Sequence, residues 1–316
     1  MKTLLYKSEP QRGKYWQHIL ADLAPQIRFI HWTDLDFSQG DPAVFGEVDY
    51  LVAWEPPEKI AQRLPQLKVL FSVGAGVDQF DLKQLPPTLP VVRMIEPGLT
   101  QGMVEYVTFA TLALHRDMPL YLQQQTRGEW RRHPVASASK RRVGVMGLGE
   151  LGQATLKALI NFGFECHGWS RSGNTPQGVT GWAGVEQLPA FLSRCDILIC
   201  LLPLTPQTRG MLNAALFAQL PAGAALIQTG RGQQLVAEDL LAALDSGQLR
   251  AAVLDVTDPE PLPAGDALWS HPGVWITPHI ASQTQPETAV GALLDNVQRF
   301  EQGLPMQGEI DKTKGY

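Results

Sequence analysis

The chain has 316 residues, of which 44% are hydrophobic and 18% are charged, and its formal net charge is −5. These values predict a globular protein that folds as two domains rather than one. The longest basic run is Lys140, Arg141 and Arg142, so we expect neither nucleic acid nor a membrane surface as a partner. No apolar stretch reaches roughly 18 residues, the length that predicts a membrane span, and the N-terminus lacks the features of a secretion signal.

The three cysteines predict buried thiols rather than a disulfide or a metal site. Cys166, Cys195 and Cys200 are odd in number, lack the spacing of metal ligands and lie in or beside apolar runs. Reduced thiols of this kind are typical of the cytoplasm, where we expect the protein to act.

The first part of the chain alternates apolar runs typical of strands with runs typical of helices. Strands are expected at residues 3–6, 27–31, 50–53 and 68–73, and helices at residues 14–23, 59–64 and 103–115. This alternation predicts a parallel sheet that is covered by helices.

A second alternating series follows the basic loop at residues 140–142. Strands are expected at residues 143–146, 164–169, 197–202, 225–228, 252–255 and 274–276, with helices that include residues 153–162 and 238–245. Six strands in this order predict a doubly wound nucleotide-binding domain. The last amphipathic stretch, residues 286–300, has no strand after it, so we expect it to return to the first domain. The predicted domains are therefore residues 1–100 with 285–316, and residues 101–284.

The segment RVGVMGLGELG contains a GxGxxG pattern between a predicted strand and a predicted helix. In a dinucleotide-binding turn the first glycine permits the tight turn, the second admits the pyrophosphate, and the third lets helix and strand pack closely. The amides at the start of the helix then face the phosphate charge. A dinucleotide cofactor is expected here, in contact with Gly147, Gly149, Glu150, Leu151 and Gly152.

The residues after the next strand favour NADPH over NADH. An NAD site offers Asp or Glu to the ribose hydroxyls at this point, whereas this chain has Ser170, Arg171 and Ser172. Because no carboxylate repels a 2′-phosphate, Arg171 can pair with it and the serines can form hydrogen bonds to it. The alternative is an exposed arginine in an ordinary turn. Further cofactor contacts are expected at Leu202, Pro203, Thr229 and Asp255.

Three polar residues follow later strands, at the sheet edge where doubly wound folds bind their ligands. They are Arg231, Glu260 and His279. Reduction of a 2-oxo acid needs a cation for the substrate carboxylate and a proton donor for the carbonyl oxygen. Arg231 offers a fork that suits a carboxylate, and His279 suits the acid role if Glu260 orients its ring and favours imidazolium. Singly, each residue could have a structural or surface role, but their shared placement predicts an active site that requires no metal.

In the first domain, the sequence SVGAGVD follows a predicted strand. Its small residues Gly74, Ala75 and Gly76 would let a ligand approach closely, and the amides of Ala75 and Gly76 could bind the substrate carboxylate. The alternative is a tight turn that needs glycine for its dihedral angles. Trp54 follows another strand and could wall the pocket or belong to the core or the surface.

The motifs GAGVD, GLGELG, LLPLTPQTRGMLN, TGRGQQLVAEDLLAALDSG, LDVTDPEPLP and TPHIAS occur in this order. Together they resemble the D-isomer-specific 2-hydroxyacid dehydrogenases over nearly the whole chain. Within that family, the segment WSRS and the chain length resemble the A-type glyoxylate/hydroxypyruvate reductases. The family's catalytic arginine, glutamate and histidine correspond to Arg231, Glu260 and His279.

This resemblance implies NADPH-dependent reduction of glyoxylate to glycolate and of hydroxypyruvate to glycerate. It also implies an α/β fold of two doubly wound parallel-sheet domains, a Rossmann cofactor domain and a flavodoxin-like substrate domain that is discontinuous, with a cleft between them that closes on ligand. A homodimer formed through the cofactor domain is implied as well. Two positions depart from the family pattern, since Gln228 replaces a common Asn and Thr257 replaces a usual aromatic residue.

Other functions remain open from the sequence. The enzyme could reduce a larger 2-oxo acid, and its ranking of glyoxylate, hydroxypyruvate and pyruvate is not predicted. Formate or phosphite dehydrogenases use a related scaffold, but in the former Gln is expected beside the histidine rather than a carboxylate such as Glu260. A non-catalytic NAD(P)-sensing protein is a further alternative, which the intact set of Arg231, Glu260 and His279 disfavours.

Overall fold

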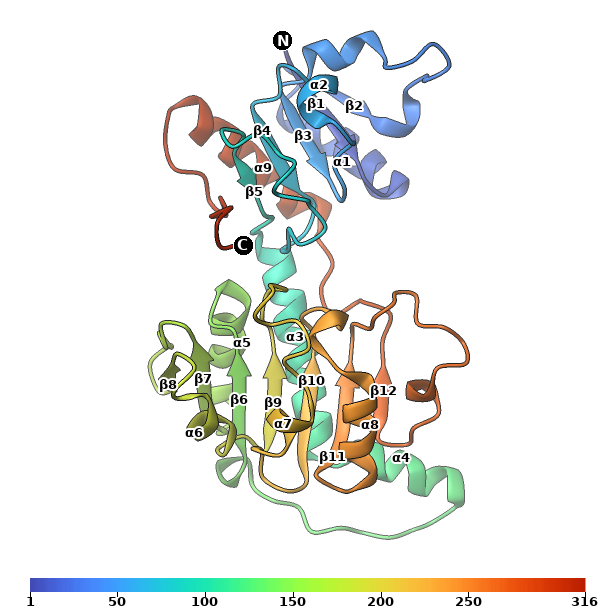
Figure 1. Cartoon of the computed structure of the whole chain (residues 1–316), viewed down its shortest axis with the longest axis vertical. Helices are drawn as coiled ribbons and strands as arrows, with labels where there is room; N and C mark the ends of the chain where they lie inside the picture. The colour runs from blue at the N-terminus through green and yellow to red at the C-terminus, as the bar shows by residue number, and fades with distance from the viewer. Residues whose placement is uncertain (316) are drawn as a thin grey trace. The chain divides into compact units, whose positions relative to one another are not determined.

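The computed structural model describes residues 1–315, and the chain divides into two units. One unit contains Met1–Leu99 and Gln283–Tyr316, and the other contains Thr100–Ser282. The expected domain boundaries, after residues 100 and 284, lie beside these divisions. Each unit is built on its own parallel sheet (Figure 1).

The first unit contains a five-stranded parallel sheet in the order β2-β1-β3-β4-β5, which is the strand order of flavodoxin-like folds. Its strands are β1 (Lys2–Lys7), β2 (Ile27–His31), β3 (Tyr50–Ala53), β4 (Val69–Ser72) and β5 (Val91–Val92). Its helical segments are α1 (Pro10–Leu23), η1 (Trp32–Asp34), η2 (Ala43–Glu47), α2 (Ile60–Arg63) and α9 (Pro286–Glu301). All residues of β3 and β4 are buried, as expected for parallel strands that are covered on both faces.

The C-terminal helix α9 packs beside α1 on one face of this sheet (Figure 1). Its apolar residues Val290 and Leu293 share a core with Tyr6 of β1 and Trp16 of α1. An amphipathic helix buries its apolar face against whichever element presents a matching surface. Here that surface lies in the first unit, far away in sequence.

A buried carboxylate connects the starts of α3 (Pro97–His115) and α9. Glu96 is 2% exposed and accepts hydrogen bonds from the amides of Gly98 (2.6 Å) and Leu99 (2.7 Å). It also accepts hydrogen bonds from the Gln285 amide at 3.0 Å and from the Thr288 hydroxyl. Acidic groups stabilise helix N-termini because they pair with amides that lack partners in the helix. Glu96 therefore caps both helices at the two places where the chain passes between the units.

The second unit contains a seven-stranded parallel sheet in the order β12-β11-β10-β9-β6-β7-β8. Its strands are β6 (Arg142–Met146), β7 (Glu165–Ser170), β8 (Thr180–Ala183), β9 (Ile197–Cys200), β10 (Ala224–Gln228), β11 (Leu249–Leu254) and β12 (Val274–Ile276). This arrangement is the dinucleotide-binding order with one more strand at the β12 edge. Two parallel-sheet α/β units confirm the predicted fold class.

Helices cover both faces of the second sheet (Figure 1). The helical segments besides α3 are α4 (Met118–Arg127), η3 (Ala138–Lys140), α5 (Glu150–Ile160), α6 (Leu188–Leu192), α7 (Ala214–Phe217), η4 (Gly232–Gln234), α8 (Ala237–Asp245) and η5 (Ala267–Trp269). Helices α3 and α5 contribute to the core on one face, and α6, α7 and α8 contribute to the core on the other. Among the described residues, no helix combines the length and the apolar character needed to cross a membrane.

Several elements differ from those expected, among them α1, which begins at Pro10 rather than at residue 14, and α4, which was not predicted. Strands β5 and β8 were not predicted, because β5 has only two residues and β8 has no fully buried residue. Helix α3 begins at Pro97 rather than at residue 103. Proline favours the first turn of a helix because its missing N–H is not needed there, and Glu96 supplies the cap.

An ion pair joins the starts of two neighbouring strands. The Arg142 guanidinium lies 2.6 Å from Asp196 Oδ1, and the Arg142 amide donates to Asp196 Oδ2 at 2.8 Å. Burial disfavours the charged form of Asp196, but the hydrogen bonds from Arg142 outweigh this effect and lower the pKa of the carboxyl. The pair therefore stabilises the register of β6 and β9 with a carboxylate that stays ionised.

All three cysteines are free and buried, as predicted. Burial raises the pKa of the Cys166 and Cys200 thiols to about 12, and it raises the pKa of Cys195 as well. A thiol reacts through its thiolate form, so these three side chains are structural rather than reactive.

Candidate active site

The glycine loop after β6 has the geometry of a phosphate cradle. Gly147 has a φ of +101°, and a Cβ there would lie 2.7 Å from the carbonyl oxygen of Leu201. A Cβ at Gly152 would clash with the carbonyl oxygen of Gly147, so α5 approaches the turn closely. Gly149 caps α5 and has open space where its Cβ would be. Each glycine thus meets the requirement of its position in a dinucleotide site, and Glu150 and Leu151 form the first turn of the helix.

The end of β7 provides polar and basic groups without a carboxylate. Ser170 is the last residue of the strand, and its hydroxyl accepts a hydrogen bond from the Gly173 amide at 3.0 Å. Arg171 and Ser172 are exposed in the turn between them. The composition of this turn suits a phosphate group better than a ribose diol.

The other expected cofactor residues also follow strands of this sheet. Leu202 and Pro203 come after β9, Thr229 directly follows β10, and Asp255 directly follows β11. The Thr229 hydroxyl donates to the carbonyl oxygen of Cys200 at 3.3 Å. All four are therefore placed at the carboxyl edge of the sheet, beyond the glycine loop.

His279 lies in a tight turn after β12 and has a φ of +54°, which is uncommon for a residue with a side chain. The Asp255 carboxylate holds this turn, since it accepts hydrogen bonds from the amides of Ile280 and Ala281, both at 2.8 Å, and from the Thr277 hydroxyl at 2.7 Å. Burial raises the pKa of Asp255 despite these donors. The Thr277 hydroxyl also lies 2.5 Å from the Tyr106 hydroxyl of α3. The hydrogen bonds accepted by Asp255 thus stabilise the turn that carries His279.

Glu260 and His279 form a pair. The Nδ1 atom of His279 lies 2.8 Å from Glu260 Oε2, and the two side chains are 36% and 38% exposed. The other carboxylate oxygen of Glu260 accepts the Thr257 amide at 3.1 Å. Since a carboxylate accepts a hydrogen bond from Nδ1–H, the Nε2 atom of His279 is the one left for a substrate.

Arg231 lies on the loop after β10, directly before η4. Its Nη1 atom donates to the Gly230 carbonyl at 2.9 Å. A Cβ on the next residue, Gly232, would clash with the Thr257 carbonyl oxygen, so the arginine loop and the glutamate loop touch. Arg231, Glu260 and His279 therefore lie on three loops at one sheet edge. The Glu260 loop contacts both the Arg231 loop and His279.

Two buried glutamines beside Arg231 were missed as site residues. In the sequence, Gln228 is distinctive only as a departure from the family pattern, and Gln234 is not distinctive. Their exposed fractions are 0% and 1%. Glutamine is usually a surface residue. For Gln228 the available signal was a polar residue at the end of an otherwise apolar strand, whereas Gln234, at the end of η4, gave no such signal.

The Gly74 to Gly76 loop follows β4 in the first unit and is held by a buried serine. The Ser72 hydroxyl donates to the Gly76 carbonyl at 2.7 Å and accepts from the Gly74 amide at 3.2 Å. Trp54 is 41% exposed, and its ring lies 3.5 Å from where a Cβ on Gly74 would be. Gly74 does not have a positive φ. The structure thus places Trp54 beside this loop and on the surface of its unit.

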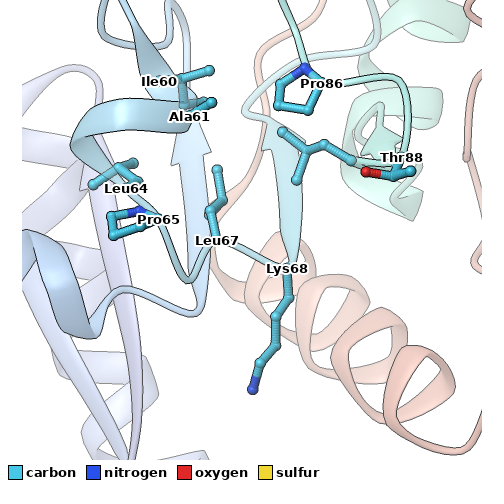
Figure 2. Close-up of a pocket in the computed structure, with 9 residues that line it drawn as sticks. Ile60, Ala61, Leu64, Pro65, Leu67, Lys68, Pro86 and Thr88 are labelled. Carbon is cyan, nitrogen blue, oxygen red and sulfur yellow. The ribbon is translucent and has the colours of Figure 1, made fainter.

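A pocket elsewhere in the first unit has a volume of about 220 Å³ (Figure 2). It lies between α2 and residues 86–89, and its walls come mostly from aliphatic and proline residues. Lys68 is its single ionisable lining residue, and the Lys68 Nζ atom pairs with Asp49 Oδ1 at 2.7 Å. The pocket lacks an acid–base pair, so the carboxyl edge of the second sheet remains the candidate active site.

Comparisons with known proteins agree with this geometry. Residues 108–281 match the family model described as D-isomer specific 2-hydroxyacid dehydrogenase, NAD binding domain. The chain is 42% identical over 310 residues to glyoxylate/hydroxypyruvate reductase A of Yersinia enterocolitica, and the match covers 96% of each protein. This chain belongs to the D-isomer specific 2-hydroxyacid dehydrogenase family. The matched region of this dehydrogenase contains the glycine loop, Arg231, Glu260 and His279.

Solved structures of family members resemble the whole dehydrogenase. One is a D-isomer specific 2-hydroxyacid dehydrogenase from Xanthobacter autotrophicus in complex with NADPH and MES, which is 37% identical with a TM-score of 0.93, over 100% of this chain and 99% of that one. Another is the NADPH-dependent glyoxylate/hydroxypyruvate reductase of Sinorhizobium meliloti in complex with NADP and sulfate, which is 36% identical with a TM-score of 0.91 over 100% of both chains. The family predicted from the sequence is thus confirmed.

Proposed function

We propose that this protein is an NADPH-dependent reductase of small 2-oxo acids, which converts glyoxylate to glycolate and hydroxypyruvate to D-glycerate. The observation that carries the proposal is the 2.8 Å contact between His279 and Glu260 at the sheet edge that also holds Arg231 and the glycine loop. The Yersinia and Sinorhizobium proteins named glyoxylate/hydroxypyruvate reductase support the choice of substrates. The structures bound to NADPH and NADP support the choice of cofactor.

The residues of the cofactor loop fit the proposed dinucleotide. Gly147, Gly149 and Gly152, with Glu150 and Leu151, would hold the pyrophosphate at the start of α5. Ser170, Arg171 and Ser172 would bind the 2′-phosphate, and the remaining contacts would come from Leu202, Pro203, Thr229 and Asp255. When bound, NADPH supplies the hydride that adds to the carbonyl carbon of the substrate.

The proposed roles of the other residues follow from their chemistry. Arg231 binds the substrate carboxylate and polarises the carbonyl group. His279 donates the proton from Nε2 to the carbonyl oxygen as the hydride arrives at carbon, and Glu260 holds Nδ1 and orients the ring. The Gly74, Ala75 and Gly76 loop, with Trp54 beside it, is the candidate substrate contact of the first unit.

We also propose that the protein acts as a homodimer in the cytoplasm. Three apolar side chains of the second unit support the dimer, since Phe109 is 63% exposed, Trp130 is 99% exposed and Val135 is 62% exposed. Large apolar side chains that are exposed in a single chain are often covered in a protein interface. The buried, reduced thiols fit a cytoplasmic location.

The proposed function is tested by steady-state oxidation of NADPH and, separately, of NADH. The substrates are glyoxylate, hydroxypyruvate, pyruvate and a bulky branched 2-oxo acid. We expect the fastest turnover with NADPH and the first two substrates. Preference for the bulky acid would contradict the substrate assignment, preference for NADH would contradict the cofactor assignment, and binding of NADPH without turnover of any substrate would identify a sensor.

A further inference from the structure

Two buried glutamines bind the backbone on either side of Arg231. Gln228 ends β10 and Gln234 ends η4, and both are almost fully buried. Burial of a primary amide is unfavourable unless its donors and acceptor find partners. The hydrogen-bond partners of these two amides therefore indicate what the glutamines hold in place.

The amide of Gln234 has opposite partners at its two ends. Its Oε1 atom accepts hydrogen bonds from the Arg231 amide at 2.8 Å and from the Gln228 side chain at 3.2 Å. Its Nε2 atom donates to the carbonyl oxygens of Leu202 at 3.0 Å and Pro203 at 3.1 Å. Because carbonyl oxygens accept and an N–H donates, only one orientation of the amide satisfies all four groups.

Gln228 binds the same residue from the other side. Its Nε2 atom donates to the Arg231 carbonyl oxygen at 2.8 Å, and its Oε1 atom accepts from the Gly230 amide at 3.4 Å. Both backbone polar groups of Arg231 are thus bound by side-chain amides, the N–H by Gln234 and the C=O by Gln228.

The glycines that flank Arg231 permit this arrangement. A Cβ at Gly230 would clash with Gln234 Oε1, and a Cβ at Gly232 would clash with the Thr257 carbonyl oxygen. The backbone of Arg231 is therefore enclosed by the two amides and by the loop that carries Glu260. Little freedom remains for the point from which its side chain extends.

From these contacts we propose that Gln228 and Gln234 are positioning residues that fix the backbone of Arg231 and so set where its guanidinium meets the carboxylate of the substrate. The inference rests on the proposed function, since it concerns the same arginine. It adds that Gln234 couples this arginine to the Leu202 and Pro203 loop, which is a proposed cofactor contact. It also gives a reason for Gln at position 228, because its amide reaches both Arg231 and Gln234.

The test replaces Gln228 and Gln234 by methionine, singly and together, because methionine has a similar length and no amide. Gln219→Met is the matched control, since Gln219 is exposed in the turn between α7 and β10 and donates to the Ala215 carbonyl at 2.9 Å. The readouts are the dissociation constant of oxalate on the NADPH-loaded protein, the dissociation constant of NADPH, and the KM and kcat for glyoxylate. Oxalate offers a carboxylate without a reducible ketone, so its binding reports on Arg231 independently of turnover.

We expect Gln228→Met to weaken oxalate binding and raise KM by about tenfold, while NADPH binding stays within about twofold of the wild type. Gln234→Met should weaken the binding of both ligands, because it loses the contacts with both loops. The loss of oxalate-binding free energy in the double variant should not exceed the sum of the losses in the two single variants, since both residues act on Arg231. The control should match the wild type in every readout.

Wild-type affinity for oxalate in a folded Gln228→Met protein would overturn the inference. If that variant does not fold, Gln234→Met is judged by the same criterion. Equal weakening of oxalate and NADPH by Gln228→Met would also contradict the inference, since it would indicate general disruption of the unit. A wild-type protein that neither binds oxalate nor reduces any 2-oxo acid would instead refute the proposed function.

Discussion

His279 has a backbone conformation that few residues other than glycine adopt. A positive φ costs on the order of 1 kcal/mol for a residue with a Cβ, so it persists only where the surroundings impose it. Here the Asp255 carboxylate imposes it by binding the amides of Ile280 and Ala281. The position of the histidine ring is therefore determined by a buried acid that need not touch the substrate.

Replacement of His279 tests the proposed proton donor. His279→Asn should lower kcat by about two to four decades, the usual contribution of a general acid, while the NADPH dissociation constant changes little. Asn is chosen because it tolerates a positive φ and so preserves the turn. Stopped-flow and steady-state rates with glyoxylate measure the loss, and turnover close to that of the wild type would remove His279 from this role.

We propose that the preference for NADPH depends on Arg171. Arg171→Ala should raise the KM for NADPH by about tenfold or more, because a charge-assisted contact with the 2′-phosphate is lost, and should leave the KM for NADH nearly unchanged. The exposed Arg194 gives a matched control, since Arg194→Ala removes the same charge elsewhere in the unit. An unaltered ratio of the two KM values in the Arg171 variant would place phosphate recognition at other residues.

The candidate site residues that the sequence predicts are those whose chemistry is distinctive at their position. Arg231, Glu260 and His279 are charged or titratable groups after apolar strands, which makes them conspicuous. Gln228 and Gln234 were not predicted, because an uncharged amide has no such signal and its burial depends on loops that meet only in the fold. The role of Asp255 in the histidine turn was missed for a similar reason, as its donors lie more than twenty positions later in the chain.

At the scale of elements, the long apolar runs were sufficient to locate the strands that carry the site. Strands β6, β7, β9, β10 and β11 lie where the sequence predicts them, because parallel strands buried on both faces are mostly apolar. The edge strand β12 was also predicted, since its residues Val274, Trp275 and Ile276 are apolar although only partly buried. The edge strand β8 was missed, since half of its residues are exposed and the rest are only partly buried.

The Arg142–Asp196 pair should make the second sheet sensitive to acid. Because the folded state lowers the pKa of Asp196, the stabilisation is present above the unfolded pKa, about 3.9, and is lost as the pH falls through the folded value. Asp196→Asn should therefore lower the free energy of unfolding by about 1 to 3 kcal/mol at neutral pH. Urea unfolding at several pH values should show the deficit shrinking below about pH 4.

A second arginine–aspartate pair serves as the comparison. Arg63 binds Asp41 at 2.6 Å, but the Asp41 side chain is 46% exposed, against 19% for Asp196. Asp41→Asn should therefore cost less than about 1 kcal/mol, the usual limit for an exposed pair. A deficit in Asp196→Asn that is independent of pH would show that the charge of the pair does not contribute.

At the scale of the whole molecule, the final helix is the exception to a simple rule, in which each successive series of elements forms its own unit. The two series of alternating strands and helices gave two sheets, and the final helix α9 joined the sheet formed by the start of the chain. That α9 belongs to the first unit could be inferred only because no strand follows it in the sequence. The residues that it contacts, such as Tyr6 and Trp16, are not indicated by any local pattern.

The proposed homodimer is tested by measuring mass in solution. Light scattering should give twice the mass of the chain for the wild type, and Phe109→Glu should shift the protein toward the single-chain mass, because a charge at an apolar interface is unfavourable. Tyr15→Glu is the control, since Tyr15 and Phe109 are both 63% exposed but Tyr15 lies on α1 of the first unit. A wild type with the mass of one chain would contradict the proposal.

The burial of all three native thiols gives the chain a practical property. With the pKa values of Cys166 and Cys200 at about 12, few thiolates exist at neutral pH, and none is accessible to a reagent. A cysteine introduced at an exposed position would then react with a maleimide dye or a spin label far faster than the native ones. Fluorescence or spin-resonance probes could thus be attached at chosen sites without first replacing any native cysteine.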